Sequence, residues 1–222
     1  MSAQQLPPQR SMAITVQIVS IVFYTFIAFL CIGLPIAVLP SYVHEQLGFS
    51  AIVAGLVIGS QYLATLLSRP MAGRMSDTIG TKRAIVYGLL GIVLSGALTL
   101  LSTLLQSYPL PSLLILILGR LLLGIAQGLI GVGTISWCMG QVGVEHTARS
   151  IGWNGIASYG AIAIGAPLGV VMVAEYGFTS LGISLSVLAA GALLLIRHKP
   201  SVPVIRGERL PFWAVFGRIA PF

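Results

Sequence analysis

The chain has 222 residues, of which 56% are hydrophobic and only 8% are charged, and its mean hydropathy is +0.98. A soluble domain carries about 25% charged residues, so this composition excludes a water-soluble globular protein and indicates a membrane protein. The net charge of +7 would suggest nucleic acid as the partner of a soluble chain. Here the positions of the charges indicate membrane topology instead, and we expect no nucleic-acid partner.

Six apolar runs are each long enough for a helix of about 20 residues, which crosses the hydrocarbon core of a bilayer. We therefore expect an all-α polytopic membrane protein rather than an outer-membrane barrel, whose strands alternate in hydrophobicity. Residues 1–199 should form the six-helix transmembrane bundle, and residues 200–222 a cytoplasmic linker leading towards a seventh span. The runs are Ile14–Leu39, Ala51–Leu67, Ala84–Leu105, Leu113–Met139, Ile151–Ala174 and Phe178–Ile196.

The first run has no small-residue cleavage site after it, so it is a spanning helix and not a signal peptide. Cys31 and Cys138 both lie inside apolar runs, so we expect no disulfide, no metal site and no cofactor. Lys and Arg residues fall almost entirely in the N-terminal segment and in alternate loops. By the positive-inside rule, both ends of the chain are expected to be cytoplasmic.

Large polar side chains occur mainly in the first, second, fourth and fifth runs. Polar groups inside a membrane tend to face a wet cavity or the interior of the bundle. These four runs are therefore predicted to surround a cavity, with the third and sixth facing lipid. The predicted cavity and substrate-binding residues are Gln17, Tyr24, Gln61, Arg120, Gln127 and Asn154.

In the fourth run, Arg120, Gly124, Gln127, Gly131 and Thr134 recur at steps of four and three, so they share one helical face. The glycines have two interpretations, either close helix packing through small residues or the wall of a cavity. Arg120 lies roughly 10 Å below the outer surface at about 1.5 Å per residue, where an unpaired charge costs at least about 3 kcal/mol. It is either bonded to helix carbonyls, Gln61 or Gln127, or it meets an anionic or polar substrate or moves protons.

A polar stretch, "GRMSDTIGTKR", separates the second and third runs. In spacing, Gly73, Asp77, Gly80, Lys82 and Arg83 resemble the cytoplasmic loop motif of the major facilitator superfamily, although Thr78 replaces its usual basic residue. "GRLLLGIAQG" is similar to the fourth-helix motif of that family, with Arg120 in the arginine position. "GAIAIGAPLG" is similar to the fifth-helix motif of its antiporters, with Ala166 interrupting the usual Gly-Pro pair.

The whole chain resembles the N-terminal six-helix half of such a transporter, in the bacterial YhhS-type branch. The resemblance implies 3+3 inverted repeats, a bacterial inner-membrane location and a missing C-terminal half as partner. Gly73 and Gly80 would permit a tight turn, Asp77 would latch the inner gate, and Lys82 and Arg83 would anchor the third span. In the fifth-helix motif, Pro167 with Gly165 and Gly169 would let the fifth span bend or pack at the interface between halves.

The resemblance implies secondary active transport of a small solute by alternating access, as proton-coupled export. Within that class, an uptake symporter or uniporter is the alternative. From another class, a non-transporting membrane scaffold or sensor remains open. No span holds a catalytic constellation and the chain has no nucleotide-binding P-loop, so we expect neither an enzyme nor an ATP-driven pump. The expected partners are a small-molecule substrate, protons as coupling ion, and the lipid bilayer.

Overall fold

A computed structural model describes residues 8–201, with side chains from residue 11 onward, and within this range every regular element is helical. Six helices are long and apolar enough to cross a membrane, which confirms the predicted all-α polytopic fold. These are α1 (Pro8–Ile36), α3 (Ala51–Ile79), α4 (Thr81–Leu104), α5 (Pro109–Val142), α6 (Thr147–Tyr176) and α7 (Thr179–Ile196). Three short elements lie between them: α2 (Leu39–Ser41), the π-helix η1 (Tyr42–Gln46) and the 3₁₀ helix η2 (Val144–His146).

The largest departure from the sequence prediction is the length of α3. The apolar run ends at Leu67, but the helix continues through Pro70 to Ile79, so its 29 residues span roughly 43 Å at about 1.5 Å each. Hydropathy detects only the part of a helix that is immersed in lipid, whereas backbone hydrogen bonding carries the helix on into water. The expected polar loop is therefore mostly helix, and only Gly80 separates α3 from α4.

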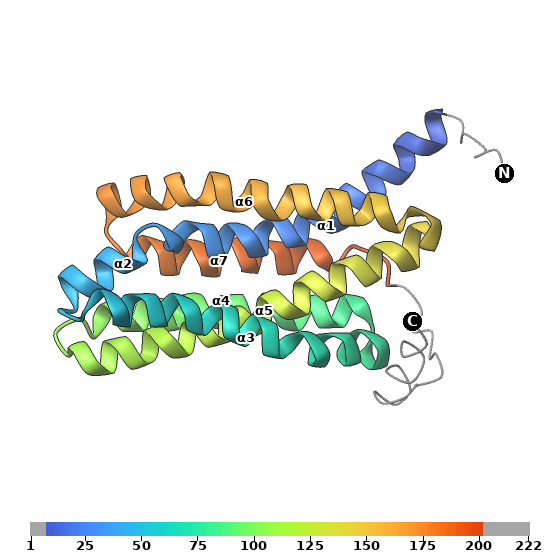
Figure 1. Ribbon diagram of the computed structural model, residues 1–222. Coiled ribbons are helices and arrows are strands. Elements are labelled where there is room, and N and C mark those ends of the chain that lie inside the picture. The colour runs from blue at the N-terminus through green and yellow to red at the C-terminus, as the bar shows by residue number, and fades with distance from the viewer. Residues whose placement is uncertain (1–7, 202–222) are drawn as a thin grey trace, which may run out of the picture.

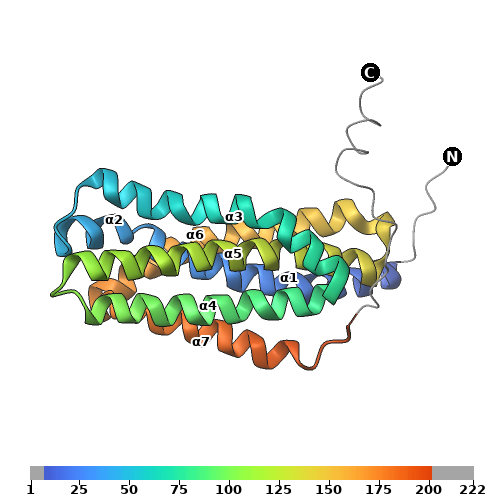
Figure 2. The ribbon, with the colours of Figure 1, turned by 90° about the horizontal axis from the view of Figure 1, so that it is seen from below.

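The six long helices form three layers. Figures 1 and 2 show α3 and α6 on one side of the molecule, α1 and α5 in the middle, and α4 and α7 on the opposite side. The central helix α1 packs along α6, and the central helix α5 packs along α3. If the first three spans are matched in order to the last three, α1 corresponds to α5 and α3 corresponds to α6. The two pairings are then equivalent, as expected for 3+3 repeats.

Glycines allow the closest of these helix contacts. A Cβ atom on Gly124 would overlap the carbonyl oxygen of Gln61 on α3, and one on Gly128 would overlap the hydroxyl of Ser68. On α4, Gly96 meets the backbone of α7 in the same way. For the glycines of α5 that touch α3, close packing is thus the correct interpretation. Gly55 and Gly59 of α3, in contrast, have no neighbour within 4 Å.

Candidate functional site

Arg120, on α5 in the middle layer, is the one charged side chain buried among the described residues, with 1% of its surface exposed. Its Nη2 atom lies 3.5 Å from the hydroxyl of Thr99 on α4, and its Nε–H has no partner. The carboxylates of the described part of the chain all lie at or beyond helix ends: Glu45, Asp77, Glu145 and Glu175.

Gln61 and Gln127, which the sequence prediction placed beside Arg120, belong to the contact between α3 and α5. The Thr65 hydroxyl lies 3.0 Å from Oε1 of Gln127, to which it can donate, and 3.1 Å from the carbonyl oxygen of Gly124. Gln61 is also buried, and its Nε2 atom has no hydrogen-bond partner. Neither glutamine is bonded to Arg120 in the described structure.

The remaining predicted cavity residues are distributed along α1 and its neighbours. Tyr24 is buried and stacks on Trp137 of α5, with ring centroids 6.0 Å apart. The hydroxyl of Thr25, next to Tyr24, donates to Oδ1 of Asn154 on α6 at 2.9 Å. Nearer the N-terminal end of α1, Nε2 of Gln17 donates to Oε1 of Gln141 at 2.6 Å. The structure therefore places these residues in contacts between helices of this bundle.

Two surface pockets, of about 490 and 590 Å³, are found at the ends of the bundle, and neither is lined by a predicted cavity residue. The first lies between the η1 segment and the start of α3, and its lining includes His44 and Glu45. The second lies where α3 meets α4.

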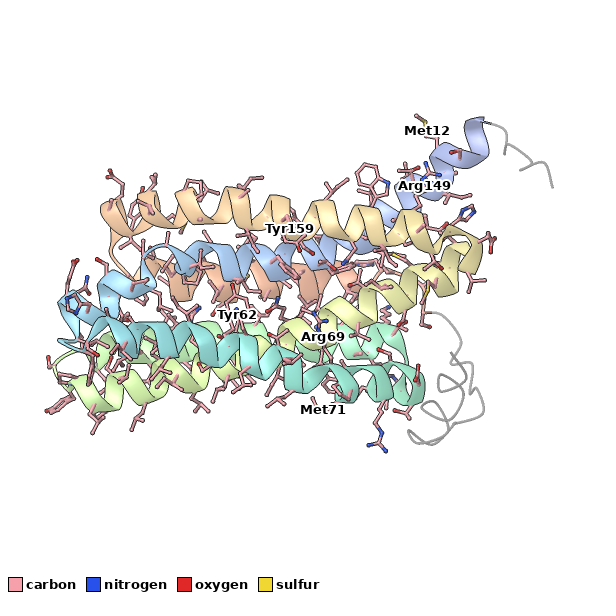
Figure 3. The ribbon with its side chains drawn as sticks, in the orientation of Figure 1. Met12, Tyr62, Arg69, Met71, Arg149 and Tyr159 are labelled. Atoms are coloured by element: carbon pink, nitrogen blue, oxygen red, sulfur yellow. The ribbon has the colours of Figure 1, made fainter. Side chains whose placement is uncertain are left out.

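A different set of polar side chains is exposed on the α3 and α6 side of the bundle. Figure 3 shows Tyr62 and Arg69 of α3 and Tyr159 of α6 on this side, which we name the open face. Tyr62 is 45% exposed and Tyr159 is 77% exposed. The sequence prediction missed these residues as site candidates. Gly55, Gly59, Tyr62, Leu66 and Arg69 recur at steps of four and three, and this period was the signal for one shared helical face.

The five residues of the loop motif have three different settings. Gly73 lies inside α3 with open space around it, so the expected turn at Gly73 is wrong, whereas Gly80 forms the break between helices with φ of +99°. Asp77 is exposed on the last turn of α3. Lys82 Nζ donates to the carbonyl oxygens of Arg197, at 3.3 Å, and Lys199, at 2.5 Å. Arg83 is exposed one residue further along α4.

The fifth-helix motif divides between two faces of α6. Gly165 and Gly169 lie against Gly33 and Leu34 of α1, where an added Cβ would meet backbone atoms. Pro167 is exposed on the other side of the helix. The expectation that these glycines pack at an interface with another half is therefore corrected: they pack within this bundle. Of the three motif residues, only Pro167 is exposed and available for a contact with another half.

Six apolar spanning helices in three layers define a polytopic α-helical membrane protein. The chain belongs to the Major Facilitator Superfamily, whose family model matches residues 21–218. An MFS-type transporter of Pseudomonas aeruginosa is 52% identical over 97% of this chain and 54% of its own length. One of Burkholderia pseudomallei is 49% identical over 99% of this chain and 54% of its own length. The chain thus spans about half the length of these curated relatives.

Two solved structures share the fold. A D-xylose–proton symporter has a TM-score of 0.67 at 15% identity, covering 83% of this chain and 48% of the symporter. The human organic anion transporter MFSD10 has a TM-score of 0.69 at 20% identity, covering 94% of this chain and 52% of the transporter. At these identities the likeness shows the fold alone, and in both the match extends over about half of the longer chain.

Proposed function

We propose that this chain is the N-terminal half of a secondary transporter that moves a small solute across the inner membrane by alternating access. Membership of the superfamily and the half-length match to relatives support a protein with a second, missing half. The open face of α3 and α6 is the side on which that half would sit, because it carries the unpacked glycines and the exposed tyrosines. Solute would pass between the two halves.

The observation that carries this proposal is the burial of Arg120 with no carboxylate partner among the described residues. Leaving a guanidinium in the membrane with its Nε–H unbonded is costly, so packing alone does not account for an arginine there. The residue lies on α5, in the layer directly behind the open face. We propose that Arg120 binds an anionic or polar group of the substrate or assists proton movement. Tyr24, Gln61, Gln127 and Asn154 are proposed to contribute polar groups elsewhere along the same transport path, and Gln17, which pairs with Gln141 near the other end of α5, to act at its cytoplasmic end.

Proton-coupled export is the direction that we propose, because the segment around Pro167 resembles the antiporter motif. Uptake by a symporter or uniporter is the alternative within transport. Asp77 is proposed to latch the cytoplasmic gate, since it is exposed beside the break at Gly80 and is available to the positive N-terminus of a helix from the other half. The bacterial relatives support an inner-membrane location, with both ends of the chain in the cytoplasm.

The test is transport by the complete protein in proteoliposomes, with a solute first selected as one that raises its melting temperature. Arg120→Ala should abolish saturable transport while the protein still inserts and folds. Arg120→Lys should restore only part of the rate, because a point charge replaces the planar fork. Arg149→Lys is the matched control, since Arg149 contacts Ser11 and Thr15 at the helix ends.

Two outcomes would contradict the proposal. Wild-type rates in Arg120→Ala would reduce this arginine to a structural role. A complete protein that shows no saturable solute flux or counterflow with any stabilising solute would favour a membrane scaffold or sensor, because such a protein needs no transport cycle.

A further inference from the structure

A second pocket lies at one end of the bundle, where the last residues of α3 meet the first turns of α4. This pocket has a volume of about 590 Å³, and its lining includes Gly80, Lys82, Arg83, Tyr87 and Ser201. Two cationic side chains line it, and no carboxylate of the described residues does. The pocket lies at the end of the bundle that carries most of the Lys and Arg residues, which is the cytoplasmic end by the positive-inside rule.

Lys82 holds the end of α7 beside this pocket. Because its ammonium donates to the carbonyl oxygens of Arg197 and Lys199, the segment 197–199 is fixed next to the start of α4. That segment contributes Arg197, His198 and Lys199, and its Arg and His side chains are exposed. Lys82 and Arg83 of the lining and Arg197 and Lys199 of the adjoining segment therefore concentrate positive charge at this pocket.

A stripe of apolar side chains extends from the pocket along the outer face of α4. Tyr87, Leu90, Leu94 and Leu101 are between 42% and 54% exposed, and their spacing of three, four and seven residues places them on one helical face. In Figure 2 this helix lies with α7 on the side away from α3 and α6. A ligand in the pocket would thus contact cationic side chains at one end and the apolar surface of α4 along the rest of its length.

We propose that this pocket binds the phosphate headgroup of an anionic membrane phospholipid, with an acyl chain lying along the α4 stripe. Arg83 supplies the bidentate donors that suit a phosphate, and Tyr87 lies where the polar headgroup region meets the hydrocarbon. Basic pockets beside membrane helices on the cytoplasmic side favour such headgroups. A soluble phosphate would use the same cations but would gain nothing from the stripe.

Native mass spectrometry of the complete protein in detergent tests this site, with phosphatidylglycerol and phosphatidylcholine of identical acyl chains as probes. The wild type should bind phosphatidylglycerol at least about five-fold more tightly than phosphatidylcholine. Arg83→Gln should weaken phosphatidylglycerol binding by about five-fold. Arg83→Lys should retain part of the preference. Arg74→Gln is the matched control, because Arg74 is an exposed arginine near the same end of the bundle but outside the pocket.

Each other outcome overturns the proposal in a different way. Equal binding of the two lipids by the wild type would mean that the pocket is filled otherwise, for instance by another part of the chain. An equal loss in Arg74→Gln would indicate general surface charge. Displacement of phosphatidylglycerol by glycerol phosphate at equal concentration would mean a soluble anion site, and an unchanged preference in Arg83→Gln would remove Arg83 from the site.

Discussion

Gly169 of α6 lies directly against the main-chain carbonyl of Leu34 on α1, so that a Cβ atom at this glycine would overlap the carbonyl oxygen. One turn earlier, Gly165 meets Gly33 of α1, again through backbone atoms. Such a contact brings two helix backbones together without side chains between them. Backbone cannot move aside as a flexible side chain can, so this contact sets the distance between the middle layer and α6.

Gly169→Ala should therefore destabilise the protein by about 1–3 kcal/mol or more, as over-packing does, despite the higher helix propensity of alanine. Gly160→Ala is the matched control on the same helix, because nothing lies within 4 Å of its Cβ position. It should leave stability unchanged or raise it by up to about 1 kcal/mol. The measurement is the melting temperature of each variant in detergent. Equal melting temperatures would show that α6 can shift away from α1.

The two glycines of the loop motif should respond in opposite ways. Gly80 has φ of +99° and ψ of +147°, a region that is essentially restricted to glycine, so Gly80→Ala should cost about 1–3 kcal/mol. Gly73 is inside α3 with nothing within 4 Å of its Cβ position, so Gly73→Ala should be neutral or stabilising. Thermal unfolding of both variants provides the comparison. Similar losses would restore the turn at Gly73 that the sequence suggested.

The sequence predicted the number of spans well, because each apolar run is separated from the next by polar or turn residues. It predicted the end of α3 poorly, because residues 68–79 are helical but not apolar, and hydropathy does not report backbone hydrogen bonding. Gln127 was assigned to a cavity from its polarity, yet its side chain is bonded to Thr65 of the adjacent helix. Polarity and period identify which residues share a face, but only the packing of α3 against α5 decides which face stays open.

The orientation can be tested with single cysteines at exposed positions in the connections and helix ends. Gln106→Cys and Thr179→Cys should react with an impermeant thiol reagent in intact cells. Thr78→Cys and Glu145→Cys should react only after permeabilisation, since the basic residues place their end of the bundle in the cytoplasm. All four positions are exposed, whereas the native Cys31 and Cys138 are buried. Labelling of Thr78→Cys in intact cells would invert the topology.

Asp77→Asn separates a gating role from a structural one. Asp77 lies on the last turn of α3, where a negative charge is unfavourable for the dipole of its own helix. Its removal should therefore leave the melting temperature unchanged or slightly raised, while the transport rate falls and substrate affinity persists. Thr78→Ser, next to it, keeps the hydroxyl that bonds to the carbonyl oxygen of Arg74 and serves as the control. A collapse of affinity at a normal rate of conformational exchange would contradict the latch.

The accessibility of the open face to water can be tested with single cysteines. If solute and water pass along α3 and α6, then Tyr62→Cys and Tyr159→Cys in the complete protein should react with a small hydrophilic thiol reagent, since these positions are 45% and 77% exposed. Leu94→Cys is the control, because it is 54% exposed on the outer face of α4, where lipid keeps the thiol from ionising and excludes the reagent. A transported solute should slow labelling at Tyr62 and Tyr159 but not at the cytoplasmic position Thr78. Equal labelling at Leu94 would mean that the open face is no more accessible to water than the outer face of α4, and would contradict this path.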